Sequence, residues 1–216
     1  MAGPELAETF GNIDVYLFDQ LLKGRIAPGM RVIDMGCGGG RNLVYLLRQG
    51  FDVRGSDQNP KAIRAVRRLA AELRPELGPG GFRVDRIEAP TFEAASGDIV
   101  ICNAVLHFAR DRTHFDAMID GLWRVLAPGG ILFCRLASSV GLEGRTHSLG
   151  NGRHLLPDGS ERFLTSEQDL MDATQRLGGV LLDPLKATVV QGMRAMGTWV
   201  IAKPSDTVSS LSPHRV

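Results

Sequence analysis

A glycine-rich turn follows the first strongly apolar run of this 216-residue chain. Residues Val32–Gly40 read VIDMGCGGG, so Gly36, Gly38, Gly39 and Gly40 stand where a strand gives way to a helix. Glycines let the chain turn sharply, and the first N–H groups of a helix have no partner within it. A phosphate or an adenosine could therefore lie against the backbone, although a tight turn without a ligand has the same composition.

A carboxylate narrows the ligand class. Asp57 ends the next β-forming run about 20 residues later, where an acidic side chain can accept both hydroxyls of an adenosine ribose. This spacing suits nicotinamide dinucleotides and S-adenosylmethionine (SAM) equally. A dinucleotide fingerprint beginning at Gly36 needs glycine or alanine where Arg41 stands, and Asp34 would place a carboxylate near a pyrophosphate. The turn therefore favours SAM.

The elements that would position these residues alternate along the chain. The seven predicted strands cover residues 30–35, 51–56, 82–85, 98–103, 131–136, 185–190 and 198–202. Five helical patterns accompany them. The first is capped by Asp14, the second covers residues 41–49, and the third is capped by Asn59 before Pro60. The fourth carries Phe115, Ile119, Leu122 and Leu126 at helical spacing, and the fifth has a capping box at Thr165 and Gln168.

This alternation predicts an α/β fold of the Rossmann-like kind, with a seven-stranded, mainly parallel sheet and helices on both faces. The short link between the last two strands predicts an antiparallel C-terminal pair. We expect a helical segment over residues 1–29 and one domain over 30–203. The polar sequence PSDTVSSLSPHRV of residues 204–216 predicts a disordered tail.

The composition excludes several partners. Lysine and arginine (25) nearly balance aspartate and glutamate (24), so the net charge of +1 predicts neither nucleic acid nor an anionic membrane as a partner. No apolar run reaches the roughly 18 residues of a membrane span, and the start MAGPELAETF lacks signal-peptide features, so we expect a cytoplasmic protein. Cys37, Cys102 and Cys134 lack metal or redox spacing, so we expect reduced thiols and no metal site.

Five blocks in order resemble the class I SAM-dependent methyltransferases from about Met30 to Lys203. They read VIDMGCGGG, SDQN, VDRIEAPTF, GDIVICNAVLHF and WRVLAPGGIL. The stretch GCGGGRNLVYLLRQGFDVRGSDQNPKAI also resembles the tellurite-resistance methyltransferases, up to about Ile63. The resemblance implies SAM as cofactor and S-adenosylhomocysteine as product.

The resemblance also implies which residues bind the cofactor: Asp34, Gly36, Cys37, Gly38, Arg41, Asn42, Asp57, Gln58, Asp85, Arg86 and Asn103. Gly36 and Gly38 would flank the methionyl part, Asp57 would hold the ribose and Gln58 would lie beside the adenine. Asp85 and the backbone of Arg86 would read the adenine edge, unless Asp85 only caps its loop. Asn103 would lie near the methionyl amino group, and Asp34 would organise that corner through water. Arg41 and Asn42 would face the methionyl carboxylate and the helix start, or simply open the helix.

The acceptor side offers two candidates. His107 follows the strand ending at Asn103 and could act as a general base, or it could only pack at a helix start. The stretch 138–162 carries arginines and histidines that could hold an anionic substrate, or it could be a mobile polar loop: Arg145, His147, Arg153, His154 and Arg162.

Motifs that the sequence lacks make three acceptor or reaction classes poor candidates. The sequence Asn103-Ala104-Val105-Leu106 replaces the family's motif for methylating base amino groups, and three unpaired cysteines disfavour arsenite. Aminopropyl transfer is disfavoured because Asn103 stands where an acidic residue should activate an amine. A small-molecule acceptor, which could be anionic, is the leading hypothesis. The alternative is a SAM-binding sensor or degenerate module without turnover.

Overall fold

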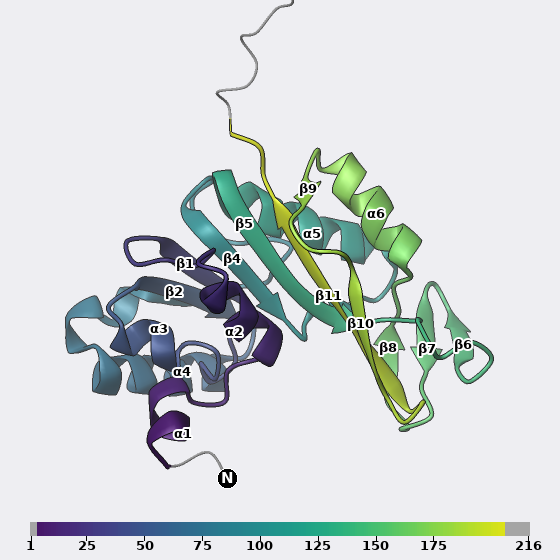
Figure 1. The fold of residues 1–216 in the computed structure, drawn as a ribbon, viewed down its shortest axis with the longest axis horizontal. Coiled ribbons are helices and arrows are strands. Elements are labelled where there is room, and N and C mark those ends of the chain that lie inside the picture. The colour runs from purple at the N-terminus through teal and green to yellow at the C-terminus, as the bar shows by residue number, and fades with distance from the viewer. Residues whose placement is uncertain (1–3, 206–216) are drawn as a thin grey trace, which may run out of the picture.

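The computed structural model describes residues 4–205, and its centre is a twisted sheet (Figure 1). Seven strands lie in the order β10 (Lys186–Val190), β11 (Arg194–Ala202), β5 (Leu126–Ala137), β4 (Gly97–Asn103), β1 (Arg31–Met35), β2 (Asp52–Asp57) and β3 (Phe82–Val84). A short eighth strand, β9 (Val180–Leu181), pairs with β11. The five strands from β5 to β3 are parallel, and β11 is antiparallel to β5, β9 and β10. The predicted mainly parallel sheet with an antiparallel C-terminal pair is confirmed, with one strand more than expected.

Helices surround this sheet. They are α1 (Pro4–Phe10), α2 (Val15–Leu22), α3 (Val44–Arg48), α4 (Pro60–Leu73), α5 (Arg112–Val125) and α6 (Glu167–Arg176), with short 3-10 turns η1 (Pro75–Leu77), η2 (Pro79–Gly81) and η3 (Leu106–Phe108). The N-terminal helix α1, which lies within the helical segment expected over residues 1–29, packs on α3 by stacking Phe10 on Tyr45. None of the helices among residues 4–205 combines the length and apolarity that crossing a membrane requires.

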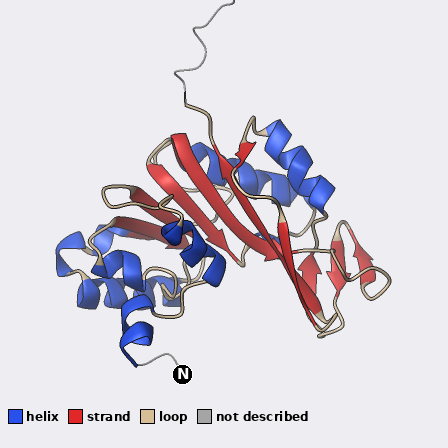
Figure 2. Cartoon of the chain, viewed as in Figure 1, coloured by secondary structure: helices blue, strands red, loops and turns tan. Residues whose placement is uncertain are grey.

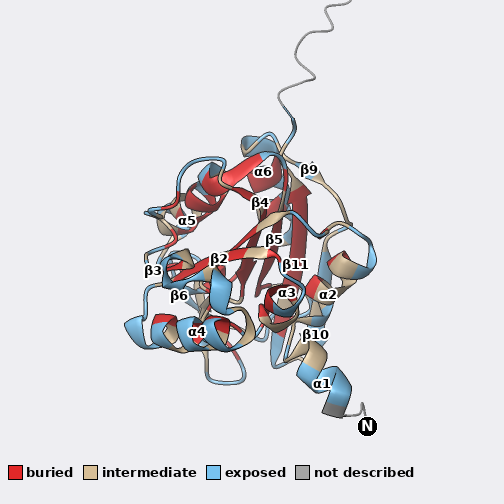
Figure 3. Cartoon of the chain, turned by 90° about the vertical axis from the view of Figure 1, so that its left-hand side faces the viewer, coloured by how far each residue is buried: buried red, intermediate tan, exposed pale blue. Residues whose placement is uncertain are grey.

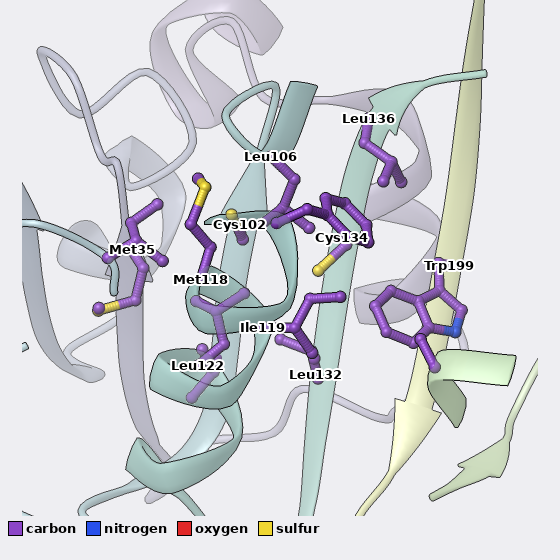
Figure 4. Close-up of a cluster of buried hydrophobic side chains, with 14 of the residues drawn as sticks. Met35, Cys102, Leu106, Met118, Ile119, Leu122, Leu132, Cys134, Leu136 and Trp199 are labelled. Carbon is purple, nitrogen blue, oxygen red and sulfur yellow. The ribbon is translucent and has the colours of Figure 1, made fainter. Parts of the chain in front are cut away.

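Alternate strand residues enter two separate apolar clusters, because successive side chains of a strand point to opposite faces. One cluster joins Ile101, Phe133 and Val200 to residues of α2, α3 and α4. The other joins β1, β4, β5 and β11 to α5 and α6 (Figure 4), around these side chains: Met35, Cys102, Leu106, Met118, Ile119, Leu122, Leu132, Cys134, Leu136 and Trp199. The central strands β1, β4 and β5 are largely buried, whereas the helices expose their outer faces (Figure 3).

Residues 138–166 depart most from expectation. In place of one long loop, a second sheet forms there from β6 (His147–Gly150), β7 (Arg153–Leu155) and β8 (Glu161–Phe163) (Figure 2). This small sheet packs against η3, where Arg153 donates a hydrogen bond to the carbonyl of Ala109 (3.3 Å). The next helix is capped by Ser166 and Asp169, one residue later than the predicted box at Thr165 and Gln168.

The other predicted elements hold with shifted ends. Asp14 caps α2 and Asn59 caps α4 as expected. The fourth predicted helix ends one residue before Leu126, which instead begins β5. Most of the predicted tail, residues 206–216, lies outside the described residues.

Candidate active site

A cavity of about 520 Å³ opens at the carboxyl edge of the parallel strands. Parallel strands bring the residues that follow them to one edge of a sheet, and ligands bind there in open α/β folds. The wall consists of Gly36 from the glycine turn, 57–59 from the end of β2, 85–88 from the loop after β3, 103–105 and Phe108 from the exit of β4, and Arg110, His114 and Met118 around α5. Six of the predicted cofactor residues therefore line one cavity: Gly36, Asp57, Gln58, Asp85, Arg86 and Asn103.

Asp57 is fixed by two backbone groups. Its Oδ2 accepts a hydrogen bond from the N–H of Gly38 (3.0 Å), and its Oδ1 accepts one from the N–H of Asn59 (2.8 Å). Each carboxylate oxygen keeps a second lone pair, because a carboxylate offers about four acceptor positions. The side chain can therefore hold the turn and still accept two ligand hydroxyls at the cavity wall.

The backbone N–H groups of the glycine turn are not open to a ligand in the way that the sequence predicts. The N–H groups of Gly36 and Cys37 both donate to the carbonyl of Ser56 (2.7 and 2.9 Å), and that of Gly40 donates to Cys37. The helix begins only at Val44 rather than at Arg41, because residues 41–43 form a turn. The unpaired amides expected to receive an anion are therefore already occupied at these three positions, which disfavours a phosphate cradle.

Gly36 is nevertheless required by the geometry. Its φ of 84° lies in the left-handed region that favours glycine, and an added Cβ would meet Cγ2 of Val105 at 2.5 Å. Both residues line the cavity. Nearby, Ala104 adopts a φ of 64°, an uncommon conformation for a residue with a side chain, where the chain leaves β4. The chain therefore adopts left-handed backbone conformations beside the cavity both after β1 and after β4.

Two buried polar side chains beside the turn lack partners. Both carboxylate oxygens of Asp34 and the Nδ2 of Asn103 have no hydrogen-bond partner in the protein. Burial raises the pKa of Asp34 to about 7, an effect that the Arg41 charge partly offsets and the Asp57 charge adds to. Arg41 also donates to the Oδ1 of Asn103 (3.1 Å). Buried groups without partners are rare, so an acceptor and a donor left open near one arginine indicate a missing ligand.

These open groups complement the amino-acid end of SAM. An ammonium would satisfy the Asp34 carboxylate, and a carboxylate would satisfy Arg41 and the Asn103 Nδ2. The chemistry of the residues present therefore fits the cofactor that the sequence predicted.

The remaining predicted cofactor residues support the site from outside the wall. Cys37 is buried beside Gly55, and the N–H of Gly38 is held by Asp57. Asn42 accepts a hydrogen bond from the N–H of Asp14 (3.0 Å), so it ties the start of α2 to the turn.

Asp85 does cap its loop, because its Oδ2 accepts from the N–H and hydroxyl of Thr91 (3.0 and 2.7 Å), yet it also lines the cavity.

His107 is not among the residues lining the cavity. It is 6% exposed, its Nδ1 has no partner, and its ring lies 4.6 Å from that of Phe108, which does line the cavity. Burial and the nearby Arg162 charge lower the pKa of His107 to about 4, so its ring is neutral near pH 7. Arg162 also lies over the ring of Phe108, which places β8 beside the cavity rim.

Sequence reasoning missed His114 and Glu88. His114 lines the cavity, its Nδ1 accepts from the N–H of Arg110 (3.2 Å), and its Nε2 lies 3.3 Å from Glu88 Oε1 without the alignment of a hydrogen bond. α5 approaches the loop closely enough that a Cβ at Gly121 would collide with the carbonyl of Ile87. A glycine inside a helix was the one sequence signal for this contact.

A family model and several curated proteins match part of this chain. Residues 33–134 match a family model described as a methyltransferase domain. This match, over a little less than half of the chain, supports the class I SAM-dependent methyltransferase family that the sequence predicts. The chain is 34% identical over 117 residues to the ubiquinone biosynthesis O-methyltransferase of Methylocella silvestris, a match covering 52% of this chain and 43% of that protein. The chain spans about half the length of the curated relatives it matches.

Solved structures agree on the fold. A SAM-dependent methyltransferase from Methanosarcina mazei superposes with a TM-score of 0.68 at 21% identity, over 86% of this chain and 98% of that one. TehB from Haemophilus influenzae superposes with a TM-score of 0.65 at 20% identity, over 88% and 62% of the two chains. These superpositions confirm the predicted α/β fold with its mainly parallel sheet.

Proposed function

We propose that this methyltransferase transfers the methyl group of SAM to an oxygen, nitrogen or chalcogen atom of a small molecule, releasing S-adenosylhomocysteine. The observation that carries the proposal is the cavity lined by Asp57 and Asn103, behind whose wall the buried Asp34 keeps two oxygens without hydrogen-bond partners. SAM supplies a methyl group on a cationic sulfur, so an acceptor lone pair can form the new bond while the old bonding pair stays on sulfur.

The chain's own residues would bind and orient the donor. Asp57 accepts the ribose hydroxyls, Gln58 lies beside the adenine, and Asp85 with the backbone of Arg86 reads the adenine edge. Asn103, Arg41 and Asp34 bind the amino-acid end, through the open groups described above. Holding the donor at both ends fixes the methyl group for in-line attack, which is the main source of rate in such a transfer.

The acceptor in this proposal is a small molecule, and we favour an anionic one. The relative from Methylocella is an O-methyltransferase of ubiquinone biosynthesis, which supports a small-molecule acceptor. Arginine is the residue best suited to bind carboxylates, and Arg162 lies at the cavity rim over Phe108. Nucleic acid is a poor candidate, because the chain carries a net charge of only +1.

Calorimetric titration tests the donor half of the proposal. We expect the native protein to bind SAM and S-adenosylhomocysteine with dissociation constants in the micromolar range, about −8 kcal/mol. Incubation with methyl-labelled SAM and a panel of phenols, thiols, amines and oxyanions should label at least one acceptor. Binding no better than millimolar would contradict the function, whereas tight binding without any labelling would favour the sensor hypothesis.

We also propose that His107 removes the proton of an acceptor hydroxyl. Its support is the unpartnered Nδ1 at the exit of β4, next to a residue of the cavity wall. Replacing His107 with glutamine should lower kcat by about 100-fold, a usual size for general-base catalysis, and leave S-adenosylhomocysteine affinity unchanged. The His114→Gln variant is the comparison, because His114 does line the cavity. A kcat within threefold of native for His107→Gln would contradict this role.

A further inference from the structure

A row of polar side chains crosses the carboxyl edge of the sheet beyond the donor site. In the strand register Asn103 of β4 lies opposite Arg135 of β5, and Arg135 lies opposite Thr198 of β11. Residues directly opposite on neighbouring strands share a face. On that face the residues two positions nearer the middle of the strands are buried and apolar: Ile101, Phe133 and Val200. The row therefore interrupts an apolar surface where the strands end.

Arg135 is buried with most of its donors unused. It is 9% exposed, and among residues 4–205 its side chain donates one hydrogen bond, from Nη1 to the hydroxyl of Thr198 (2.9 Å). Its Nε has no partner, although the Oδ2 of Asp14 lies 3.6 Å away. A guanidinium carries five N–H donors, and an arginine this deeply buried normally has them bonded. Apart from this ion pair with Asp14, the remaining donors are open to a further acceptor.

The aromatic ring of Tyr16 fixes the guanidinium in place. The ring centre lies 4.3 Å from Cζ of Arg135, and the Tyr16 hydroxyl shares a hydrogen bond with Thr188 on β10 (2.6 Å). Asp14 contributes charge, but it also caps α2 by accepting from the N–H of Tyr16 (2.9 Å). Arg135 is thus stacked and oriented, and Asp14 caps α2 through Oδ1 while its Oδ2 forms an ion pair with Nε at 3.6 Å without making a hydrogen bond. A preorganised cation of this kind suits a planar oxyanion.

Arg135 lies one strand away from the residues proposed to bind the methyl donor. In the sheet order β1, β4, β5, the glycine turn follows β1, Asn103 ends β4 and Arg135 lies one strand farther, about 5 Å away. Asp34, Asn103 and Arg41 already complement the amino-acid end of SAM. We propose that Arg135, stacked on Tyr16, binds a carboxylate of the methyl acceptor and so selects small carboxylic acids as substrates. The inference rests on the proposed function and extends it to a substrate class.

The test compares acids with their neutral amides. Salicylate against salicylamide and lactate against lactamide are titrated into protein saturated with S-adenosylhomocysteine. We expect at least one acid to bind about tenfold more tightly than its amide, a preference that Arg135→Gln abolishes. Arg31→Gln is the matched control, because Arg31 pairs with Asp98 at the opposite edge of the sheet, and it should keep the preference. Native protein with no acid preference, or a preference that survives in Arg135→Gln, overturns the proposal.

A second variant avoids dependence on the stability of Arg135→Gln. Asparagine caps helices as well as aspartate does, so Asp14→Asn should preserve α2 while removing the negative charge beside Arg135. Acid affinity should then rise several-fold while amide affinity stays constant. An unchanged acid affinity in Asp14→Asn counts against the proposal.

A third comparison excludes the donor as the source of the carboxylate. S-adenosylhomocysteine carries an amino-acid carboxylate, and methylthioadenosine does not. Arg135→Gln should bind both as native protein does. A loss confined to S-adenosylhomocysteine would assign Arg135 to the donor and overturn the acceptor role, whereas failure of native protein to bind either nucleoside would contradict the proposed function itself.

Discussion

Replacing Asp57 with alanine is expected to weaken S-adenosylhomocysteine binding by at least about 100-fold, or roughly 2.7 kcal/mol. The carboxylate accepts from the N–H groups of Gly38 and Asn59, and it is the proposed acceptor for the ribose hydroxyls. Its removal therefore leaves the glycine turn and the start of α4 without their shared partner. Each lost hydrogen bond to a charged group is worth about 1.5–3 kcal/mol. Calorimetric titration measures the loss directly.

Asp52→Ala provides the matched control. Asp52 begins the same strand at the opposite edge of the sheet, where it pairs with the exposed Arg54. Exposed ion pairs of this kind contribute little, so affinity should stay within about twofold of native. Affinity of Asp57→Ala within threefold of native would contradict the assignment of the cavity as the donor site. Thermal melting of both variants separates lost binding from lost folding.

The donor half of the site was predictable because its signals are local. Gly36 and Asp57 each stand directly after an apolar run, and parallel strands must bring such positions to one edge. What the turn does with its backbone was not predictable. The carbonyl of Ser56 accepts from Gly36 and Cys37 because β1 and β2 pair in a particular register, and no pattern within the turn specifies that register.

The acceptor half depends on contacts between distant segments. Arg135 reads as a polar interruption in an apolar run, and only the pairing with Thr198 and the packing of Tyr16 show that its donors remain open. His114 reaches the cavity because α5 packs closely at Gly121. The strands of the small sheet have three or four residues each and little burial, so they lack the apolar alternation by which a strand is recognised.

We expect the buried Asp34 carboxyl to lower the free energy of unfolding of the ligand-free protein near neutral pH, although the same carboxyl is proposed to bind the ligand. Its pKa of about 7 lies well above the ordinary value of 3.8, because burial penalises the ionised form. Below the ordinary value the carboxyl is protonated in the folded and the unfolded chain alike. Between the two values the folded protein keeps the proton while the unfolded chain loses it, so stability falls as pH rises through this window and then levels off.

Asp34→Asn should therefore stabilise the ligand-free protein in a pH-dependent way. The gain over native is smallest near pH 4 and grows to about 4 kcal/mol at about pH 8, since one unit of pKa corresponds to about 1.4 kcal/mol. Urea unfolding at about pH 5 and about pH 8 measures this slope. Asp98→Asn is the control with the opposite sign, because Arg31 holds the pKa of Asp98 below its usual range. That variant should lose stability by the same amount at both pH values.

Asp34→Asn, which should stabilise the ligand-free protein, should by contrast weaken ligand binding. An ionised Asp34 favours the ammonium group of S-adenosylhomocysteine, so native protein should bind this ligand more tightly than Asp34→Asn at about pH 8, with the advantage disappearing at about pH 5. A stability gain and an affinity loss that rise together across pH 7 would identify one titrating carboxyl as the cause of both. A gain in stability that does not vary with pH, or an affinity unaffected by the substitution, would show that Asp34 neither stays protonated in the free protein nor contacts the charged end of the donor.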